Sequence, residues 1–316
     1  MLVRSRRAFF TIYLEAVLLR SGEQLAIVAL GPQRTIPAPT SSLRDTFDGA
    51  PMISEECPPL IKWPGGKRRL LPQIREVVPT DFGNYFEPFF GGGALFFSLR
   101  PSKATLSDAN GELIHMYLEV RDHLDSVIKC LRRMVNSKDN YYRIRSSAPR
   151  SSASQAARLI YLCTLSFNGI HRQNLNGEFN VPYGYKRHLE PCDETKLRQI
   201  SHALQGRRIL VEDFEKATNR AKANDFVYFD PPYTVAHANN GFVKYNAKIF
   251  SWEDQKRLAI LARRLKSSGA HVVVSNADHS SIRDLYDGFD VRVVERHSTM
   301  AASTQFRRPV RECLFF

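Results

Sequence analysis

Short apolar runs of strand length alternate with segments of helical periodicity along most of this chain. The strand-like runs lie at residues 85–87, 103–107, 208–211, 226–229 and 271–275. Between them, apolar residues recur at helical spacing, most clearly at residues 112–131, 153–165 and 252–265. This alternation predicts an α/β fold in which helices cover a mostly parallel sheet. Two further runs, residues 291–295 and 312–316, would add a closing antiparallel pair.

The length and the distribution of charge indicate how the chain is divided into a catalytic domain and an insertion. The 316 residues are 43% hydrophobic, which is enough for an α/β core and a smaller second module. The net charge is +13, and residues 115–205 hold fourteen Lys and Arg against eight Asp and Glu. A basic surface can serve solubility alone, but this concentration of charge suits a polyanionic partner. We expect a catalytic domain at residues 56–114 and 206–316, interrupted by a mainly helical, basic insertion at residues 115–205.

Residues 1–55 do not resemble the rest of the chain. A short apolar stretch at residues 8–19 precedes a Pro-, Thr- and Ser-rich run at residues 31–42, which is typical of a linker. A functional arm or an organelle address would fit this extension, but we favour a true translation start at Met52. The apolar stretch is far below the ~20 residues of a membrane span, and Glu15 interrupts it as a secretory signal.

The five cysteines are scattered and none forms a CxxC pair, so they indicate neither a zinc site nor a disulfide framework. We therefore expect a cytoplasmic protein without a bound metal.

The tetrapeptide Asp230-Pro231-Pro232-Tyr233 directly follows the apolar run at residues 226–229. Ligands of open α/β sheets bind beyond the carboxyl ends of the strands, so the tetrapeptide lies where a site is expected. The prolines fix φ and remove backbone donors, and an ionised Asp only accepts hydrogen bonds. An exocyclic amino group fits such a cluster: Asp230 and the Pro231 carbonyl would accept its hydrogens, and Tyr233 would stack on the base. The alternative is a strand-ending Asp followed by a rigid turn.

The glycine-rich segment from Phe86 to Gly93 follows the first predicted strand and precedes a helix, a typical place for a cofactor. A nicotinamide site is the alternative, but G-x-G-x-x-G spacing is absent and Glu87 would repel a pyrophosphate. S-adenosylmethionine (AdoMet), with its cationic amino-acid end, fits better. We predict cofactor contacts from Glu87, Pro88 and Gly91. Later strand ends add two more predictions: Asp108 for ribose hydroxyls, and Asp213-Phe214 for an adenine amino group and its ring.

Two more segments are informative only in combination with these. In the stretch from Ile61 to Lys67, Trp63 stands in a rigid Pro-Gly-Gly setting between two lysines, which suits a pocket wall or an amphipathic turn. The polar loop at residues 167–184 holds Arg and Asn side chains that can read base edges and Phe and Ile side chains that can wedge between bases. An exposed hairpin is the alternative for this loop.

Together the four motifs resemble the Dam family of DNA adenine methyltransferases, which recognise GATC. The order Lys-Trp-x-Gly-Gly-Lys, Glu-Pro-Phe-x-Gly-Gly, inserted target-recognition region and Asp-Pro-Pro-Tyr matches over residues 59–316. Val274-Ser275-Asn276 resembles the family's next strand end. Family members often carry Tyr and Arg-Tyr where this chain has Phe167 and Arg172-Gln173.

The resemblance implies a Rossmann-like AdoMet-dependent methyltransferase fold, a monomer, and double-stranded DNA as the substrate. It implies AdoMet contacts from Trp63, Lys67, Asp108 and Asp230. The predicted DNA contacts are Lys62, Phe167, Asn168, Ile170, Arg172, Asn174 and Pro182, with Ile170 and Arg172 at base edges.

We therefore expect methyl transfer to N6 of an adenine that is flipped out of the duplex, without a covalent enzyme intermediate. An RNA adenine methyltransferase would use the same pocket, and a non-catalytic nucleic-acid-binding module would share the basic insertion. A glutamine-modifying protein methyltransferase fits less well, because that group resembles Asn-Pro-Pro-Tyr at this site.

Overall fold

The computed structural model describes residues 57–174, 176–234, 250–297 and 309–316. Every described residue belongs to one compact unit, Ile53–Phe316. The predicted extension at residues 1–55 therefore lies outside the described residues.

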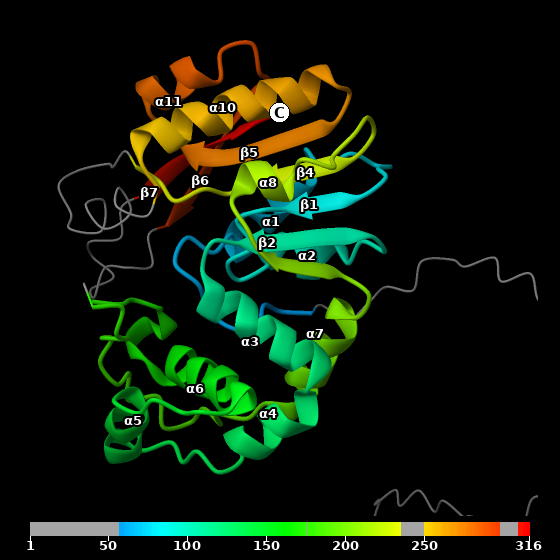
Figure 1. Ribbon diagram of the computed structural model, residues 1–316. Helices are drawn as coiled ribbons and strands as arrows, with labels where there is room; N and C mark the ends of the chain where they lie inside the picture. The colour runs from blue at the N-terminus through cyan, green and yellow to red at the C-terminus, as the bar shows by residue number, and fades with distance from the viewer. Residues whose placement is uncertain (1–56, 175, 235–249, 298–308) are drawn as a thin grey trace, which may run out of the picture. The chain divides into compact units, whose positions relative to one another are not determined.

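The described residues form one seven-stranded sheet with the order β3-β2-β1-β4-β5-β7-β6 (Figure 1). The five strands β1 to β5 run parallel, and β7 is antiparallel to both β5 and β6. The α/β fold with a closing antiparallel pair is thus confirmed. The strands are β1 (Tyr85–Glu87), β2 (Ala104–Asp108), β3 (Arg208–Val211), β4 (Phe226–Phe229), β5 (His271–Ala277), β6 (Val291–His297) and β7 (Pro309–Phe315).

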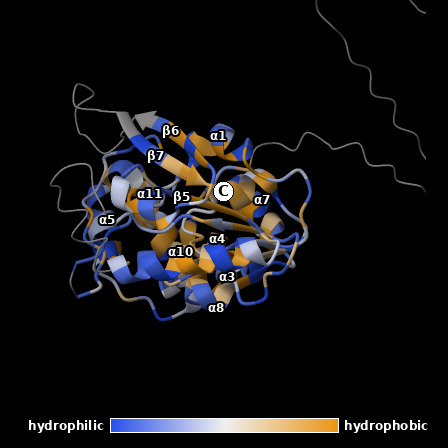
Figure 2. Ribbon diagram, turned by 90° about the horizontal axis from the view of Figure 1, so that it is seen from above, coloured by the Kyte–Doolittle hydropathy of each residue, from blue (hydrophilic) through white to orange (hydrophobic). Residues whose placement is uncertain are grey.

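Alternate strand residues pack into two apolar clusters on opposite faces of the sheet. Tyr85 and Phe226 belong to the cluster with α1, α2, α3 and α7, whereas Phe86 and Val227 belong to the cluster with α8, α10 and α11. A parallel sheet is normally buried on both faces, which explains the continuous apolar strands. Figure 2 shows hydrophobic residues along the central strands and mixed colours along α10. The helices are α1 (Leu71–Arg75), α2 (Ala94–Leu99), α3 (Gly111–Asp122), α4 (Leu124–Leu131), α5 (Lys138–Arg145), α6 (Ser152–Leu165), α7 (Glu194–Leu204), α8 (Phe214–Ala217), α10 (Trp252–Ser267) and α11 (Ser280–Leu285).

Capping side chains determine where several helices begin. The Asn110 side chain accepts from the Leu113 amide at the start of α3, and Ser251 and Asp254 form a reciprocal capping box at the start of α10. The single helical segment expected at residues 112–131 is two helices, because the backbone of His123 leaves the helical region (φ −131°, ψ 36°). This break lets α3 pack along the sheet while α4 packs against α6. None of the helices in the described ranges is long and apolar enough to span a bilayer.

The helices α4, α5 and α6 and the loop that follows them share a core with the sheet. Tyr85 of β1, Tyr117 of α3 and Tyr141 of α5 belong to one buried apolar cluster. The loop is a hairpin held by bridges between Ser166 and Tyr183 and between Gln173 and Phe179, and we call residues 166–183 the hairpin. The Tyr141 hydroxyl donates to the Val181 carbonyl at 3.0 Å. Continuous packing therefore connects the hairpin to the sheet, as Figure 1 shows for α3 between the sheet and α6.

Candidate active site

The predicted site residues meet at the carboxyl edge of the sheet, beside its topological switch point. From β1 the chain proceeds outward to β2 and β3 on one side, then returns to β4 and β5 on the other. Glu87, Asp108 and Asp230 therefore end or follow three adjacent strands, β1, β2 and β4. Open α/β sheets bind ligands at this point.

Lys67 and Asp230 form the closest ion pair of this edge. Lys67 Nζ lies 2.6 Å from Asp230 Oδ1 and 3.8 Å from Glu312 Oε2, and it also donates to the Gly65 carbonyl at 2.8 Å. The lysine is buried, and Asp230 is only partly exposed. A buried charge needs such partners, because an unpaired one would cost several kcal/mol.

Tyr233 completes this cluster, and contacts hold both its hydroxyl group and its ring. Its hydroxyl donates to Glu312 Oε2 at 2.7 Å and lies 3.5 Å from Ser275 Oγ, while Lys67 Nζ lies 5.0 Å from its ring centroid. Burial raises the pKa of Tyr233 well above its usual range, and the carboxylates of Glu312 and Asp230 raise it further. The phenol therefore stays neutral, with its hydroxyl engaged and its ring placed beside Asp230.

The glycine-rich turn is pinned by the strand ends on either side of it. Asp108 Oδ2 accepts from the Gly91 amide and Oδ1 from the Asn110 amide, each at 2.9 Å, while the Tyr117 hydroxyl donates to the Gly91 carbonyl at 3.1 Å. Burial raises the pKa of Asp108, and these amide hydrogen bonds oppose the shift. Gly91 has a φ of +48°, and a Cβ there would lie 2.9 Å from Trp63 Cδ1. Only glycine allows this close approach without strain.

Glu87 is a buried carboxyl beneath this turn. Its Oε2 accepts from the Tyr85 hydroxyl at 2.9 Å. Burial raises its pKa to about 8, and the negative charge of Asp230 contributes in the same direction. Around neutral pH the side chain therefore holds a proton. A cation bound at this edge would lower that pKa again, because it favours the ionised form.

An aromatic stack connects this edge to the hairpin. The Trp63 and His171 rings lie 4.5 Å apart and nearly parallel, and Phe179 meets the His171 ring edge-on at 5.6 Å. Glu112 accepts from Gln173 at 3.1 Å, and His171 and then Arg158 keep its pKa below the ordinary value. Trp63 is thus shared between the glycine-rich turn and the hairpin.

The predicted adenine contacts, Asp213 and Phe214, interact with α8, α10 and Phe89. Phe214 is buried and stacks on Phe89 at 5.5 Å, with the Arg257 guanidinium 4.9 Å from its ring centre. The exposed Asp213 caps α8 through the Glu215 amide and pairs with Arg257 at 3.2 Å. These contacts tie the pair to α8 and α10 rather than to the Lys67–Asp230 cluster, and their proposed cofactor role stays a prediction.

The predicted DNA contacts lie on or beside the hairpin. Lys62, Phe167, Asn168, Arg172 and Pro182 are exposed, whereas Ile170 and Asn174 are half-buried. Phe167 leaves 46% of its surface exposed, which is unusual for a phenyl ring. Asn168 has a φ of 55°, a left-handed conformation that Asn tolerates.

Polar contacts within the hairpin orient its predicted reading residues. Arg172 Nε donates to Asn180 Oδ1 at 2.8 Å. Asn174 closes the tip, because its side chain bonds Glu178 and accepts from the amides of Asn176 and Glu178.

Sequence reasoning assigned no role to Glu312, His171 or Lys186, which the structure places among these groups. Lys186 lies close to Lys62 beside Gly169, and burial, then the charge of Lys62, lowers its pKa to about 8. A charged residue inside the apolar run at residues 312–316 was the available signal for Glu312. The other two residues carry no local signal that separates them from an ordinary hairpin.

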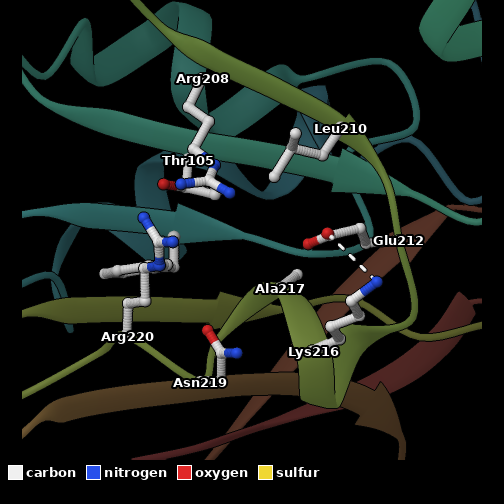
Figure 3. A pocket seen from close by; sticks show the side chains of 9 residues that line it. Thr105, Arg208, Leu210, Glu212, Lys216, Ala217, Asn219 and Arg220 are labelled. Atoms are coloured by element: carbon white, nitrogen blue, oxygen red, sulfur yellow. Dashed lines mark ion pairs between the residues drawn. The ribbon is translucent and has the colours of Figure 1, made fainter.

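A hollow of about 130 Å³ lies away from these groups, over β2 and β3 (Figure 3). It exists because the crossover from β3 to β4 contributes only the four-residue helix α8 to this face. Arg208 and Arg220 extend into it beside the Glu212–Lys216 ion pair. None of the predicted site residues lines it, so it is separate from the Lys67–Asp230 cluster. In the described parts of the chain, no three His, Cys, Asp or Glu side chains gather in a way that could hold a metal ion.

Comparisons with known proteins identify the family of this chain. A family model described as D12 class N6 adenine-specific DNA methyltransferase matches residues 63–300. The Type II methyltransferase M1.LlaDCHI of Lactococcus lactis subsp. cremoris is 38% identical over 266 residues, which cover 81% of this chain and 94% of that protein. The Type II methyltransferase M.MjaIII of Methanocaldococcus jannaschii is 35% identical, with 76% and 91% covered. The DNA adenine methylase of Escherichia coli is 31% identical, with 80% and 93% covered.

Proposed function

The chain belongs to the D12 class of N6 adenine-specific DNA methyltransferases, and we propose that it methylates adenine within GATC at the site formed by Lys67, Asp230 and Tyr233. The observation that carries this proposal is the position of Asp230 and Tyr233. Both follow β4 at the switch point, where Lys67 contacts the carboxylate of one and lies over the aromatic ring of the other. A flipped adenine needs these two groups for its amine and its ring.

AdoMet is the methyl donor of this class, and the residues at the carboxyl edge fit it. Carboxyl groups at the ends of adjacent strands suit a ligand with a positively charged sulfur and an ammonium group. The absence of a Cβ at Gly91 lets Trp63 pack directly on the glycine-rich turn, at the edge where the cofactor would bind. We propose that Asp108, Gly91 and Trp63 bind the cofactor together with Lys67, Glu87, Pro88, Asp213, Phe214 and Asp230.

The protein's part in the reaction is to orient the target amine. Asp230 and the Pro231 carbonyl would accept its two hydrogens, and the ring of Tyr233 would stack on the base. When bound, AdoMet supplies a methyl group on a positively charged sulfur, and the N6 lone pair forms the N–C bond as the C–S electron pair passes to sulfur. Positioning and electrostatics would supply the rate enhancement, and the extra proton on N6 can leave to water afterwards.

The insertion at residues 115–205 would provide the sequence specificity. The hairpin displays an Arg with one nitrogen already held by Asn180, which leaves the other guanidinium donors for a guanine edge. Phe167 and Ile170 could enter the stack that the target adenine leaves. The preference for GATC rests on the resemblance of this loop to the Dam family. Cytoplasmic location and a monomeric state stay predictions.

The decisive experiment is transfer of tritium-labelled AdoMet methyl groups to methyl-free duplex DNA, followed by base analysis and site mapping. We expect N6-methyladenine within GATC. Asp230→Ala is the matched negative control, because loss of one preorganised partner commonly lowers the rate by about a hundredfold or more. Label on RNA but not on duplex DNA, or equal rates on GATC and all its single-base variants, would contradict the proposal.

A further inference from the structure

Glu312 is a fully buried carboxyl group (0% exposed) that comes from β7, at the far end of the chain from Lys67 (Figure 1). In the sheet it lies opposite Ala277 of β5 and Val294 of β6, which are both apolar and buried. An apolar residue would fit this position better than Glu. A buried, unpaired carboxylate lowers the stability of the fold by several kcal/mol. A buried carboxylate at this position therefore needs partners, and Tyr233 and Lys67 are among them.

These two partners of Glu312 belong to the proposed catalytic cluster. Its Oε2 accepts from the Tyr233 hydroxyl at 2.7 Å and lies 3.8 Å from Lys67 Nζ. The same lysine is 2.6 Å from Asp230. One ammonium group is thus shared unequally between two carboxylates, and one of these carboxylates also holds the aromatic ring.

This arrangement addresses a conflict in the proposed function, on which the inference rests. Asp230 would have to accept a hydrogen from the adenine amine, yet in the free protein its Oδ1 is bound closely by Lys67. A cation on that oxygen competes with a weaker, neutral donor. A second carboxylate within reach of the lysine can take over part of its interaction when the amine arrives.

We propose that Glu312 is a positioning residue for methyl transfer, with two effects. Its hydrogen bond from Tyr233 sets the plane of the ring on which the target base stacks. Its charge gives Lys67 a second partner, so that the Asp230 carboxylate can release the lysine and accept from the adenine amine when the base arrives. Glu312 acts only through these two residues and does not contact the base.

Two substitutions separate these effects. Glu312→Gln keeps an acceptor for Tyr233 but removes the charge opposite Lys67, whereas Glu312→Leu removes both. Glu295→Gln on the neighbouring strand β6 is the matched control, because Glu295 is exposed and has Arg311 as its ion-pair partner. For each variant, kcat and KM for GATC duplexes are measured, together with AdoMet affinity and melting temperature.

A readout independent of turnover is 2-aminopurine fluorescence. With this base analogue at the target position, and no AdoMet present, the signal reports how the flipped base stacks on Tyr233. We expect Glu312→Gln to lower kcat by about tenfold with KM, AdoMet affinity and the 2-aminopurine signal unchanged, since the hydrogen bond from the amine to Asp230 matters most when N6 becomes positively charged in the transition state. Glu312→Leu should lower kcat further and change the signal.

The proposal is overturned if Glu312→Gln turns over like the wild type, or if its loss of activity matches a loss of AdoMet binding or melting temperature, as a structural role would produce. Should Glu312→Leu fail to fold, the comparison of Glu312→Gln with Glu295→Gln still decides. Failure of the proposed function looks different, because then the wild type itself transfers no methyl group to DNA.

Discussion

At the scale of single residues, Glu87 has the pKa that most directly links the site to pH. Its folded-state pKa of about 8 lies above the ordinary 4.5, so the folded protein keeps a proton that the unfolded chain releases. The stability that this group contributes is fully present below about pH 4.5 and is lost as the pH rises through about 8. At neutral pH much of this contribution is already lost, although folded Glu87 is still a neutral acid that accepts from Tyr85.

Glu87→Gln should remove this pH dependence, because an amide does not ionise. Between about pH 5 and about pH 9, the melting temperature of the wild type should fall by more than about 4 °C beyond any fall seen for the variant. Calorimetric melts across that range measure the difference, with Glu190→Gln as the exposed control. A gap between wild type and Glu87→Gln that does not change with pH would show that Glu87 titrates normally.

Arg172 is the residue on which the proposed base readout depends most. It is exposed, and Asn180 fixes one end of its guanidinium group. Arg172→Ala should cost about 1–3 kcal/mol at one base pair of the site and relax discrimination there. Methylation rates on GATC duplexes and on every single-base variant test this, with the exposed Arg187→Ala as a control.

A different result would assign Arg172 to the DNA backbone. In that case Arg172→Ala should weaken DNA binding equally for all sequences. The slope of the logarithm of the binding constant against the logarithm of the salt concentration should become smaller by about one. An unchanged preference profile would therefore remove Arg172 from the base-reading set.

At the scale of elements, the glycine-rich turn between β1 and α2 connects the two halves of the site. Its Gly91 amide holds Asp108, its Gly91 carbonyl is held by Tyr117, and its surface contacts Trp63. Trp63 in turn stacks on His171 of the hairpin. The position of this turn therefore affects both the proposed cofactor pocket and the proposed DNA-reading element.

Gly91→Ala should weaken AdoMet binding by about tenfold or more, because a non-glycine residue at this φ is strained by about 1–3 kcal/mol and its Cβ would collide with Trp63. Gly92→Ala is a matched control next to it, since the nearest atom to a Cβ there is the Ile61 carbonyl oxygen at 3.4 Å. Isothermal titration with AdoMet measures both variants. Equal affinities for Gly91→Ala and Gly92→Ala would contradict the proposed place of the turn in the pocket.

At the scale of the whole molecule, the residues that the proposed function uses all belong to the compact unit Ile53–Phe316. The family match also begins within this unit, at residue 63. Within it, one apolar cluster runs from the sheet to the helices of the insertion. The hairpin is thus supported by the same core that supports the catalytic edge.

A protein that starts at Met52 should therefore fold and methylate DNA at the rate of the full chain. Chain ends that contribute no site residue usually tolerate removal. Steady-state rates and melting temperatures of the two proteins test this. Insolubility or loss of activity of the shorter protein would mean that residues 1–51 support the domain.

The sequence by itself determined the fold class and the carboxyl-edge motifs, because these depend on local patterns. Each of these signals depends only on residues close to it in the sequence. They are the apolar runs of strand length, the glycines at Gly91 to Gly93 and the tetrapeptide after β4. Since the ends of parallel strands must meet at one edge, the approach of Asp108 and Asp230 also followed from order alone.

Only the tertiary structure decided which side chains from distant parts of the sequence form ion pairs, stack on one another or line the same cavity. Glu312 reaches Tyr233 and Lys67 because β7 inserts between β5 and β6, and this strand order, unlike the antiparallel pair itself, is not specified by a local pattern. The partner of the Phe214 ring, Phe89, likewise follows from how α8 packs on the sheet, and the cofactor role of Phe214 stays a prediction. The periodicity of a strand or helix determines the face to which a side chain points. Which side chain it contacts there depends on how the elements pack against one another.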